Sequence, residues 1–457
     1  MLIGNTGKMV TMNTFNGTLD IYLASAGSGK THQLMEIIDS YVQQGVPLDR
    51  IAFVTFTKKG AEVAQNRMME RYQVGINNLK NFRTIHSMTF RGVKAGRDMM
   101  MDFTKYKDFG NKAGYNFGYI GLNYAEGINF YEMKDLQLIA MEQLYRNNRP
   151  YFDKIAEDKV DNEELVRFMK LYTKYKDTFH YYDFTDLLDL YLKNGIVEDV
   201  DVVCLDEMQD SSLLQWQVVF QAFSKAQHIY VCADIKQCIF SYAGASPETV
   251  LKLRGNVHMM DKSYRVPSVI LDFAQHQIVD EMELSDHSDC KAVHEGGELK
   301  YLTSLDELDS YYQPGKTYFF LARNKRFFDT YIDWCKQHAV PYRIRGVPIF
   351  TVSDQLEFRE GRTDTWDTDK LQFARDCYRA GTFYGEPNID ISTIHTVKGD
   401  EADVVVLMSD ISRAVESQLD IDPDSEHRVF YVGVTRAKEK LLIVEPQTKR
   451  YYPYIIV

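Results

Sequence analysis

The chain has 457 residues, enough for about three domains and for a core that needs neither disulfides nor metals to fold. Apolar residues make up 45% and charged residues 26%, which excludes a disordered, collagen-like or coiled-coil chain. With 65 acidic against 53 basic residues the net charge is -12, so any nucleic-acid site has to be a local basic face. The six cysteines form no CxxC pair, which argues against a zinc knuckle or a thioredoxin-like site and predicts reduced, mostly buried thiols. Because no run of about 18 uncharged apolar residues and no secretory signal is present, we expect a cytoplasmic protein without a membrane segment.

Short apolar runs that alternate with helical patterns predict a parallel α/β fold. The first twenty residues carry no strong pattern. The first group of expected strands is 21–23, 51–56, 202–205 and 229–232, with a helix from Lys30 onward. A mostly helical insertion is expected between two of these strands. A second α/β pattern has expected strands at 318–321, 391–394, 404–407 and 441–444, interrupted by a polar stretch of low periodicity at 351–388.

A glycine-rich turn that follows the first strand and opens the first helix is the sharpest signal in the sequence. It reads Ala24-Ser25-Ala26-Gly27-Ser28-Gly29-Lys30-Thr31. Glycines let backbone N–H groups close around phosphate oxygens, and the helix N-terminus favours an anion. Lys30 is expected to reach the β and γ phosphates, and the Thr31 hydroxyl to bind Mg²⁺. This loop alone does not separate kinases, GTPases and motor ATPases.

Two adjacent acids, Asp206 and Glu207, follow the buried strand 202–205 in the segment Asp206-Glu207-Met208-Gln209-Asp210. They would repel each other unless a cation lies beside them. Asp206 is therefore the candidate Mg²⁺ ligand, and Glu207 the candidate base that orients and deprotonates the attacking water. The alternative for the segment alone is an exposed acidic loop.

The segment from Lys58 to Arg97 holds nine Lys and Arg residues but only two acids, Glu62 and Glu70. Interleaved Thr, Ser, His and Phe residues suit phosphate contacts and base stacking. The alternative is a solvated helix face.

Taken in order, these segments resemble the superfamily 1 DNA helicases of the UvrD/Rep/PcrA type, with a phosphate loop like that of RecB and AddA, where Ala also stands first. The resemblance implies two RecA-like parallel-sheet P-loop domains, with a helical insertion in the first and a reduced insertion in the second. The implied bounds are 1–90 and 191–262 for the first RecA-like domain, 91–190 for its insertion, 263–350 and 389–457 for the second, and 351–388 for the reduced insertion.

The resemblance also implies roles for individual residues. The implied catalytic residues are Lys30, Glu207, Gln237, Arg265 and Arg436, of which Gln237 senses the γ-phosphate and Arg436 is an arginine finger. The nucleotide-binding set is Ala26, Gly27, Ser28, Gly29, Lys30, Thr31, His32, Tyr264, Arg265, Glu401 and Arg436, with Tyr264 and His32 on the adenine and Glu401 on the ribose. The nucleic-acid set is Thr57, Lys58, Thr84, His86, Tyr242, Thr393 and His395. The implied cofactors are ATP and Mg²⁺.

The chain also departs from the family pattern. Ala243 replaces an Arg that contacts DNA, Asp400 replaces a Leu, and the upstream Gln that reads adenine has no clear counterpart, which leaves selectivity for adenine open. Only about 40 residues stand where larger relatives insert an accessory domain, so the chain resembles the compact helicases that phages carry, in which case the compartment is the host cytoplasm. We expect no nuclease domain, because few residues follow Arg436.

The first functional hypothesis is a DNA-stimulated ATPase that moves on single strands and unwinds duplex DNA, with the 3′-to-5′ direction implied by the family resemblance alone. The alternative is a DNA-binding ATPase subunit or loader that gates a partner complex and unwinds poorly alone. A P-loop kinase is a third and poorer hypothesis. Expected partners are single-stranded DNA, duplex with a single-stranded tail, and proteins of replication or recombination, with the chain itself a monomer. The residues do not decide whether the substrate is RNA or DNA, or whether the protein acts in replication, repair or recombination.

Two weaker features complete the predictions. Six aromatic residues could form a base-stacking surface, but packing within the insertion is the preferred interpretation; they are Phe103, Tyr106, Phe109, Tyr115, Phe117 and Tyr119. The acidic run from Asp420 to Glu426 is expected to be a solvated loop.

Overall fold

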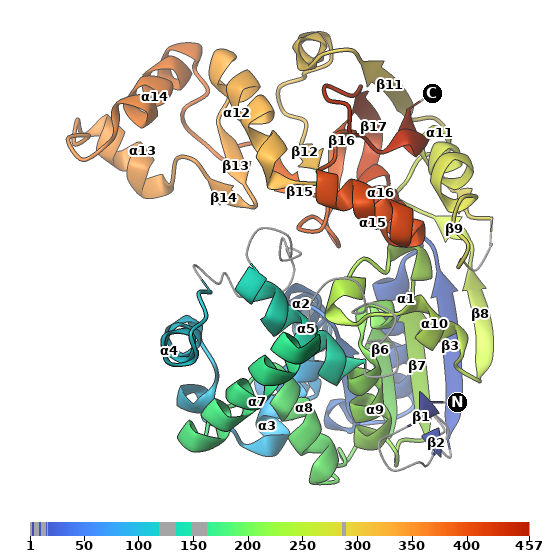
Figure 1. The fold of residues 1–457 in the computed structure, drawn as a ribbon. Coiled ribbons are helices and arrows are strands. Elements are labelled where there is room, and N and C mark those ends of the chain that lie inside the picture. Colours follow the sequence, from blue (N-terminus) through green and yellow to red (C-terminus); the bar gives the residue numbers. More distant parts are fainter. Residues whose placement is uncertain are drawn as a thin grey trace. The chain divides into compact units, whose positions relative to one another are not determined.

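The computed structural model describes residues 2–3, 9–10, 15, 17–117, 134–148, 162–285 and 289–456. It forms two compact units, whose elements are labelled in Figure 1. The first comprises Met1–Ala24 and Gly29–Met260, and the second comprises Ser25–Ser28 and Asp261–Val457. Leu2–Ile3 (β1) and Met9–Val10 (β2) pair as a short antiparallel ribbon.

The first unit is built on a six-stranded sheet in the order β5-β4-β6-β7-β3-β8, and every pair in it is parallel. The strands are β3 Thr18–Ala24, β4 Ile51–Thr55, β5 Phe82–Thr84, β6 Val202–Asp206, β7 His228–Ala233 and β8 Asn256–Met260. The four expected strands are all present. β3 begins three residues earlier than its apolar run, and the edge strands β5 and β8 were not expected.

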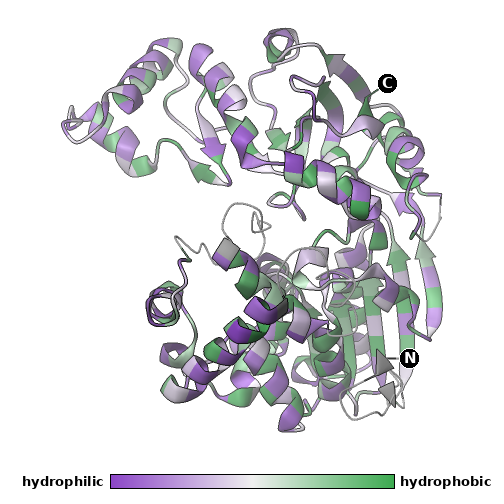
Figure 2. Ribbon diagram, in the orientation of Figure 1, coloured by the Kyte–Doolittle hydropathy of each residue, from purple (hydrophilic) through white to green (hydrophobic). Residues whose placement is uncertain are grey.

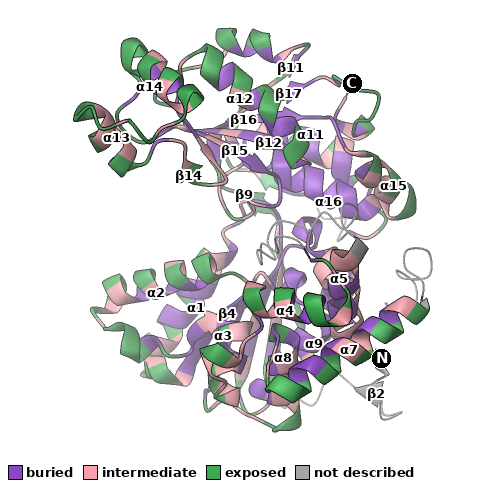
Figure 3. Cartoon of the chain, turned by 60° about the vertical axis from the view of Figure 1, so that its left-hand side comes forward, coloured by how far each residue is buried: buried purple, intermediate pink, exposed green. Residues whose placement is uncertain are grey.

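Alternate residues of these strands bury two separate apolar cores, as the two-residue period of a strand requires. Ile51 and Phe53 face the helices α1 Lys30–Gln43 and α2 Lys58–Tyr72. Ala52 and Val54 face the other core, which is formed with the helices α3 Ile85–Val93, α8 Phe184–Lys193 and α9 Leu213–Ala222. The central strands of a parallel sheet covered on both faces are buried, and Figure 3 shows these strands in the buried colour.

The described part of the insertion is helical, as expected, and it comprises α4 Phe103–Ala113, α5 Lys134–Asn147, α7 Asn162–Phe179 and α8. Tyr106, Phe109 and Phe117 are buried in its own core beside Phe168 and Tyr172. The packing interpretation of the aromatic residues is therefore confirmed for these three. Phe103 and Tyr115 are half-buried, and Tyr119 lies outside the described residues.

The second unit has a seven-stranded sheet in the order β11-β17-β16-β12-β15-β13-β14, parallel except for the antiparallel pair β13–β14. Its strands are β11 Glu298–Leu302, β12 Tyr318–Ala322, β13 Tyr342–Ile344, β14 Val347–Pro348, β15 Ile389–Thr393, β16 Ala402–Met408 and β17 Ala437–Val444. Its helices are α11 Ser268–Ala274, α12 Phe328–Gln337, α13 Val352–Arg359, α14 Thr368–Ala380, α15 Arg413–Ile421 and α16 Pro423–Val434. The short elements α10 Pro247–Leu251, β9 Lys262–Ser263 and β10 Lys291–Ala292 complete the described helices and strands.

Two expectations for the second unit need correction. The stretch 351–388 contains two helices, α13 and α14, whose alternation of apolar and polar residues is visible in Figure 2. The acidic run from Asp420 to Glu426 is not a solvated loop, because α15 ends and α16 begins within it. Glu426 is buried and makes a two-pronged ion pair with Arg323, at 2.7 and 2.8 Å. Asp424 is also buried, and it accepts the backbone N–H groups of residues 283 and 284.

The predicted α/β class, with two parallel sheets, a helical insertion in the first unit and a smaller one in the second, is confirmed. All six cysteines are free thiols in buried positions, as predicted. The finer domain bounds proposed from the sequence remain predictions.

Candidate nucleotide and nucleic-acid site

The phosphate loop joins the end of β3 to the start of α1. Ala26, Gly27 and Ser28 form its turn, in which the Ser28 N–H donates to the Ser25 carbonyl at 3.2 Å. Gly29 is the N-cap of α1 and has φ +81°, a left-handed conformation that favours glycine. No side chain caps this end of α1, so its first N–H groups and the helix dipole are left to an anion.

Lys30 and Thr31 on α1 contact the acids that follow β6. The Thr31 hydroxyl donates to Asp206 Oδ2 at 2.7 Å, and Lys30 Nζ lies 3.3 Å from Glu207 Oε1. Because β6 and β3 belong to one parallel sheet, their carboxyl ends lie along the same edge. The structure thus brings together the four residues that the sequence predicted to bind phosphate, bind the metal ion and activate the attacking water.

Glu207 adopts the left-handed conformation, with φ +55° and ψ +36°. This backbone geometry costs a residue other than glycine about 1–3 kcal/mol, and it is typical of functional sites. It turns the chain sharply between β6 and the short 3₁₀ turn η5 Met208–Asp210, and the Glu207 carboxylate then faces Lys30.

A chain of hydrogen bonds runs from Glu207 to Gln237. The Gln209 amide donates to Glu207 Oε2, and the Asp234 N–H donates to Gln209 Oε1 at 3.1 Å. The Gln237 amide donates to Asp234 Oδ2 at 2.8 Å. The roles of Gln209 and Asp234 in this chain were not predicted from the sequence, although Gln209 lies inside the acidic segment 206–210.

The electrostatics of Asp206 favour a bound cation. Burial and the neighbouring Glu207 raise the pKa of Asp206 from 3.8 to about 6. Within the described residues no ion pair reaches this carboxylate; its partners are the Thr31 hydroxyl and the Glu207 N–H. A carboxylate and a hydroxyl are hard oxygen donors, and Mg²⁺ takes few such protein ligands beside water and phosphate. The donor set therefore fits Mg²⁺.

Two predicted nucleic-acid threonines begin neighbouring helices. Thr57 caps α2, where its hydroxyl oxygen accepts the Gly60 N–H at 3.0 Å, and Thr84 caps α3 by accepting from Ser87 at 3.2 Å. The two helices follow the paired strands β4 and β5, so both N-termini lie at one edge of the sheet. Lys58, in the first turn of α2, is exposed. Two adjacent helix N-termini with an exposed lysine form a surface that favours phosphate.

The two predicted base-stacking residues of the first unit, His86 and Tyr242, each contact another aromatic side chain. The His86 ring packs edge-on against Phe184 with centroids 5.1 Å apart, and burial lowers its pKa to about 4. His86 is therefore neutral near pH 7 and can stack or hydrogen-bond but adds no charge. Tyr242 stands edge-on to Phe240, which stacks on Phe56 at 5.4 Å. Phe56 and Phe240 were not assigned roles from the sequence.

The remaining predicted site residues belong to the second unit, except His32, which is exposed on α1. Tyr264 is 58% exposed and Arg265 is half-buried. Arg436 is buried and donates to the carbonyl oxygens of Val432 at 2.9 Å and Asp400 at 3.2 Å. Glu401 is exposed, 4.0 Å from Lys438. Thr393 and His395 are buried, and Thr393 shares a hydrogen bond with Thr396 at 2.9 Å.

Comparison with known proteins decides the family. The family model described as the UvrD/REP helicase N-terminal domain matches residues 5–258, more than half of the chain. The chain belongs to the UvrD/REP helicase family. The UvrD-like helicase C-terminal domain matches residues 378–448. The predicted membership of this group of DNA helicases, and with it the class of ATP-hydrolysing helicase enzymes, is confirmed.

Individual relatives of this UvrD/REP family member are distant. A probable DNA helicase of Mycoplasma pneumoniae is 24% identical over 98% of this chain and 84% of that protein. The ATP-dependent DNA helicase Rep of Escherichia coli is 22% identical over 75% of this chain and 55% of Rep. The putative ATP-dependent DNA helicase YjcD of Bacillus subtilis is 23% identical over 54% of this chain and 34% of YjcD. The chain thus spans most of the first protein but about half or less of the other two.

Among solved structures, the helicase nonstructural protein 10 of an arterivirus matches with a TM-score of 0.40 and 9% identity, over 94% of this chain and 60% of that one. A likeness at this level adds nothing to the family assignment. In the part of the chain that the structure describes, none of the helices combines the length and apolar character needed to cross a membrane.

Proposed function

We propose that this UvrD/REP family member hydrolyses ATP to move along single-stranded DNA, in the 3′-to-5′ direction, and opens duplex DNA in its path. The observation that carries the proposal is the arrangement of Lys30 and Thr31 against Glu207 and Asp206, at 3.3 and 2.7 Å. It joins a phosphate-binding helix end to a metal ligand and a base, the parts that phosphoryl transfer to water requires.

In this proposal Lys30 and the loop 26–31 hold the phosphates of ATP, and Thr31 with Asp206 would hold Mg²⁺. Bound Mg²⁺ supplies positive charge to the phosphate oxygens. Glu207 accepts a proton from the attacking water. Gln209 and Gln237, at the two ends of the hydrogen-bond chain through Asp234, orient Glu207 and that water.

Residues of the second unit are proposed to act on the same nucleotide. Tyr264 is exposed enough to stack on the adenine, as His32 is on α1, and Glu401 would bind the ribose. Arg265 and Arg436 would neutralise charge that develops on the γ-phosphate. To do so, Arg436 has to exchange its bonds to the Val432 and Asp400 carbonyls for bonds to phosphate.

The DNA strand is proposed to follow the N-termini of α2 and α3. Thr57, Lys58 and Thr84 would bind its phosphates there, supported by the helix dipoles. His86 and Tyr242 would stack on bases in the first unit, and Thr393 with His395 would contact the strand from the second. Single-stranded DNA, and duplex with a single-stranded tail, are the proposed substrates.

Steady-state ATP hydrolysis with and without oligo(dT), beside the Lys30→Ala variant, tests this function. We expect hydrolysis that oligo(dT) stimulates and that Lys30→Ala abolishes. If the wild type hydrolyses ATP at the same rate with oligo(dT), oligo(U) and neither, the proposed DNA motor is wrong, even though the nucleotide site stands.

A further inference from the structure

The C-terminal end of α5 connects the helical insertion to the two loops that carry the hydrolytic residues. Asn148 directly follows α5 and extends it, because its N–H donates to the Leu144 carbonyl at 2.9 Å. Its side chain is buried, with 4% exposure. Asn148 Oδ1 accepts the backbone N–H of Leu213 at 2.8 Å, and its amide nitrogen donates to the carbonyl of Gly244.

The two bonds of Asn148 lie on opposite loops. Leu213 opens α9, six residues after Glu207, and Gly244 follows Gln237 by seven residues. The two loops also pair directly, through an antiparallel bridge between Ser212 and Ala245. Gly244 has φ +98°, and a Cβ there would lie 2.6 Å from the Asn148 amide nitrogen. The absence of a side chain at Gly244 thus leaves room for the Asn148 amide.

Asn147 strengthens the connection on one side. Its Oδ1 accepts from the Ser212 hydroxyl at 3.1 Å, and its amide donates to Thr185 at 3.3 Å. Ser212 is the N-cap of α9 in a reciprocal capping box with Gln215. The start of α9 is therefore fixed both from within and from α5.

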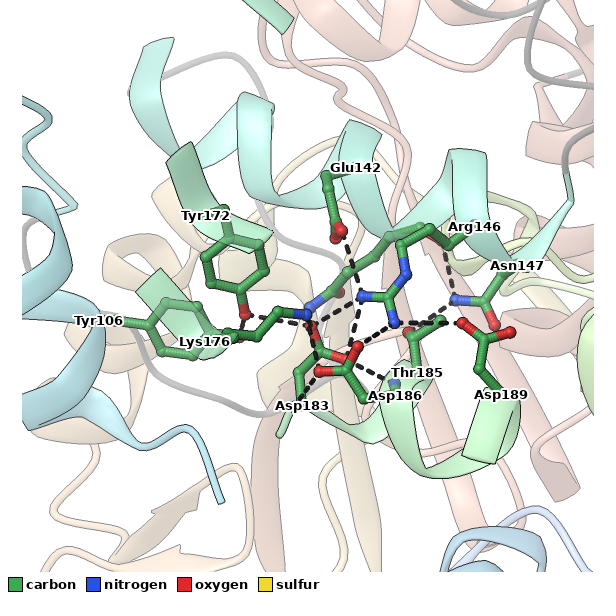
Figure 4. A network of polar contacts seen from close by, with 11 residues as sticks. Tyr106, Glu142, Arg146, Asn147, Tyr172, Lys176, Asp183, Thr185, Asp186 and Asp189 are labelled. Atoms are coloured by element: carbon green, nitrogen blue, oxygen red, sulfur yellow. Dashed lines mark hydrogen bonds and ion pairs between the residues drawn. The ribbon is translucent and has the colours of Figure 1, made fainter. Parts of the chain in front are cut away.

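A buried ion cluster anchors α5 to the rest of the insertion, as Figure 4 shows. Arg146 pairs with Asp183 at 2.9 Å and Asp186 at 2.6 Å on α8, and Lys176 of α7 pairs with the same two acids at 2.6 and 2.7 Å. A side chain held by this cluster has little freedom. Residues 147 and 148, which follow Arg146 directly, therefore present a fixed edge to the two loops.

We propose that Asn148 is a positioning residue for ATP hydrolysis, which holds the loop after Glu207 against the loop after Gln237 and ties both to the helical insertion. This inference rests on the proposed function, which gives Glu207 and Gln237 their roles at the attacking water. Asn148 does not touch that water. It acts through the backbone of Leu213 and Gly244.

The test compares kcat and KM for ATP in Asn148→Ala with those of the wild type, in the full chain with oligo(dT) present. Loss of both bonds lets the two loops shift, and a shift of about 1 Å at reacting groups costs on the order of 100-fold in rate. We therefore expect a fall in kcat of about 10- to 100-fold with KM nearly unchanged, because Lys30 and the phosphate loop are not altered.

Asn324→Ala is the matched control. Asn324 is also a buried asparagine, and its Oδ1 accepts a backbone N–H at the start of a helix, that of Ser412 at 2.9 Å. It belongs to the second unit, whereas both loops belong to the first. If Asn324→Ala lowers kcat as much as Asn148→Ala does, the effect is a general loss of stability and the inference is wrong.

Asn148→Asp supplies a readout that a merely structural role would not give. A charged Asp keeps the bond from Leu213 but faces the Gly244 carbonyl without a proton to donate, whereas a neutral Asp restores both bonds. Burial raises the pKa of a carboxyl group, so the variant should titrate in the assay range. We expect the ratio of variant to wild-type kcat to rise as the pH falls from about 8.5 to about 6.

Groups that titrate independently of residue 148 affect both proteins alike and cancel in this ratio. The charged groups nearest to residue 148 along these elements include Glu142 and Arg146 on α5, Asp183, Asp186 and Asp189 with Lys176 in the ion cluster, Glu207 and Asp210 before Leu213, and Asp234 and Lys236 beside Gln237; Tyr242 is the titratable group of the second loop. A ratio that does not change with pH would overturn the inference, as would an Asn148→Ala protein with wild-type kcat. Failure of the proposed function looks different: wild-type hydrolysis would then not respond to oligo(dT), or Lys30→Ala would hydrolyse ATP as the wild type does.

Discussion

Two buried polar clusters of the first unit contain the same kinds of side chain but differ in how charge is matched. Around Arg146 and Lys176, each of the acids Asp183 and Asp186 contacts both cations. Burial opposes ionisation of Asp183, but Lys176 and Arg146 hold its pKa below its usual range. At the phosphate loop, Asp206 contacts a hydroxyl and a backbone N–H, and its pKa rises to about 6.

The difference shows how to separate a structural cluster from a chemical one. A cluster that serves the fold brings its own cations on neighbouring helices, here α5 and α7 against α8. A cluster that serves chemistry leaves a carboxylate beside a neutral donor, where a cation from solution and a phosphate complete the charge balance. Breaking the cluster at the phosphate loop should therefore cost catalysis, whereas breaking the cluster around Arg146 and Lys176 should cost stability.

The largest effect is expected from Glu207→Gln. The amide is the same size as the carboxylate but cannot accept a proton from water, so kcat should fall by about 10²–10⁴-fold while ATP still binds. Single-turnover experiments measure the rate of hydrolysis, and a separate nucleotide-binding assay measures the affinity for ATP. Glu198→Gln is the control, because Glu198 is an acid of the same unit that pairs with Arg91 instead. Unchanged kcat in Glu207→Gln would remove Glu207 as the base.

Arg146→Met should cause a large loss of stability. Removing one partner of a buried ion cluster leaves the other charges uncompensated and typically costs about 3–5 kcal/mol. Urea unfolding can be followed by Trp216, the tryptophan of the first unit, after Trp334 and Trp366 of the second are changed to Phe. Arg379→Met, at an arginine whose side chain is 69% exposed, should be nearly neutral. Equal unfolding midpoints for the two variants would contradict the structural reading of the cluster.

Thr31→Ala should raise the Mg²⁺ concentration needed for half-maximal hydrolysis by about 10-fold or more, because groups that bind or orient a metal contribute on that order to its affinity. Titration of Mg²⁺ at saturating ATP measures this half-maximal Mg²⁺ concentration. Thr178→Ala, on α7, removes a threonine hydroxyl that donates to the backbone carbonyl of Lys174, one turn earlier in the same helix. That control should titrate as the wild type does; an unchanged Mg²⁺ requirement in Thr31→Ala would count against the metal assignment.

The smallest effect concerns Glu142. Burial raises its pKa from 4.5 to about 7, although Arg146 acts against this shift. At pH values between these two pKa values, Glu142 holds its proton more often in the folded protein than in the unfolded chain. The free energy of unfolding therefore falls as the pH rises through this range. Glu142→Gln should remove this fall and be more stable than the wild type at pH 8 by on the order of 1–3 kcal/mol. Urea midpoints at pH 5 and pH 8 test this, with Glu248→Gln, at a glutamate whose side chain is 41% exposed, as the control; equal pH slopes would refute it.

The sequence predicted those features that local patterns encode. The central strands are continuous apolar runs, and the phosphate loop and the acids after β6 occur as contiguous segments. The edge strand β8 was missed because its residues from Asn256 to His258 are exposed and lack an apolar run. The burial of Asp424 and Glu426 was missed because their partners, Arg323 and the backbone of 283–284, are distant in sequence.

The candidate site shows the same division. Lys30, Thr31, Asp206 and Glu207 could be assigned from spacing alone. The hydrogen bonds of Gln209 and Asp234, and the two bonds of Asn148, depend on which backbone groups the fold places opposite them, and a single sequence carries no signal for that. Charge state is likewise a property of the fold: loss of hydration around the partly buried ring of His86 lowers its pKa to about 4, so the ring is neutral near pH 7.

Strand displacement on tailed duplex DNA tests the central claim most directly. Wild-type protein and Glu207→Gln would be compared on duplexes with a 3′ or a 5′ single-stranded tail, with and without ATP. The account predicts ATP-dependent displacement from the 3′-tailed duplex, absent with Glu207→Gln. Displacement of neither duplex by wild-type protein that hydrolyses ATP normally would contradict it and would favour an ATPase that gates a partner.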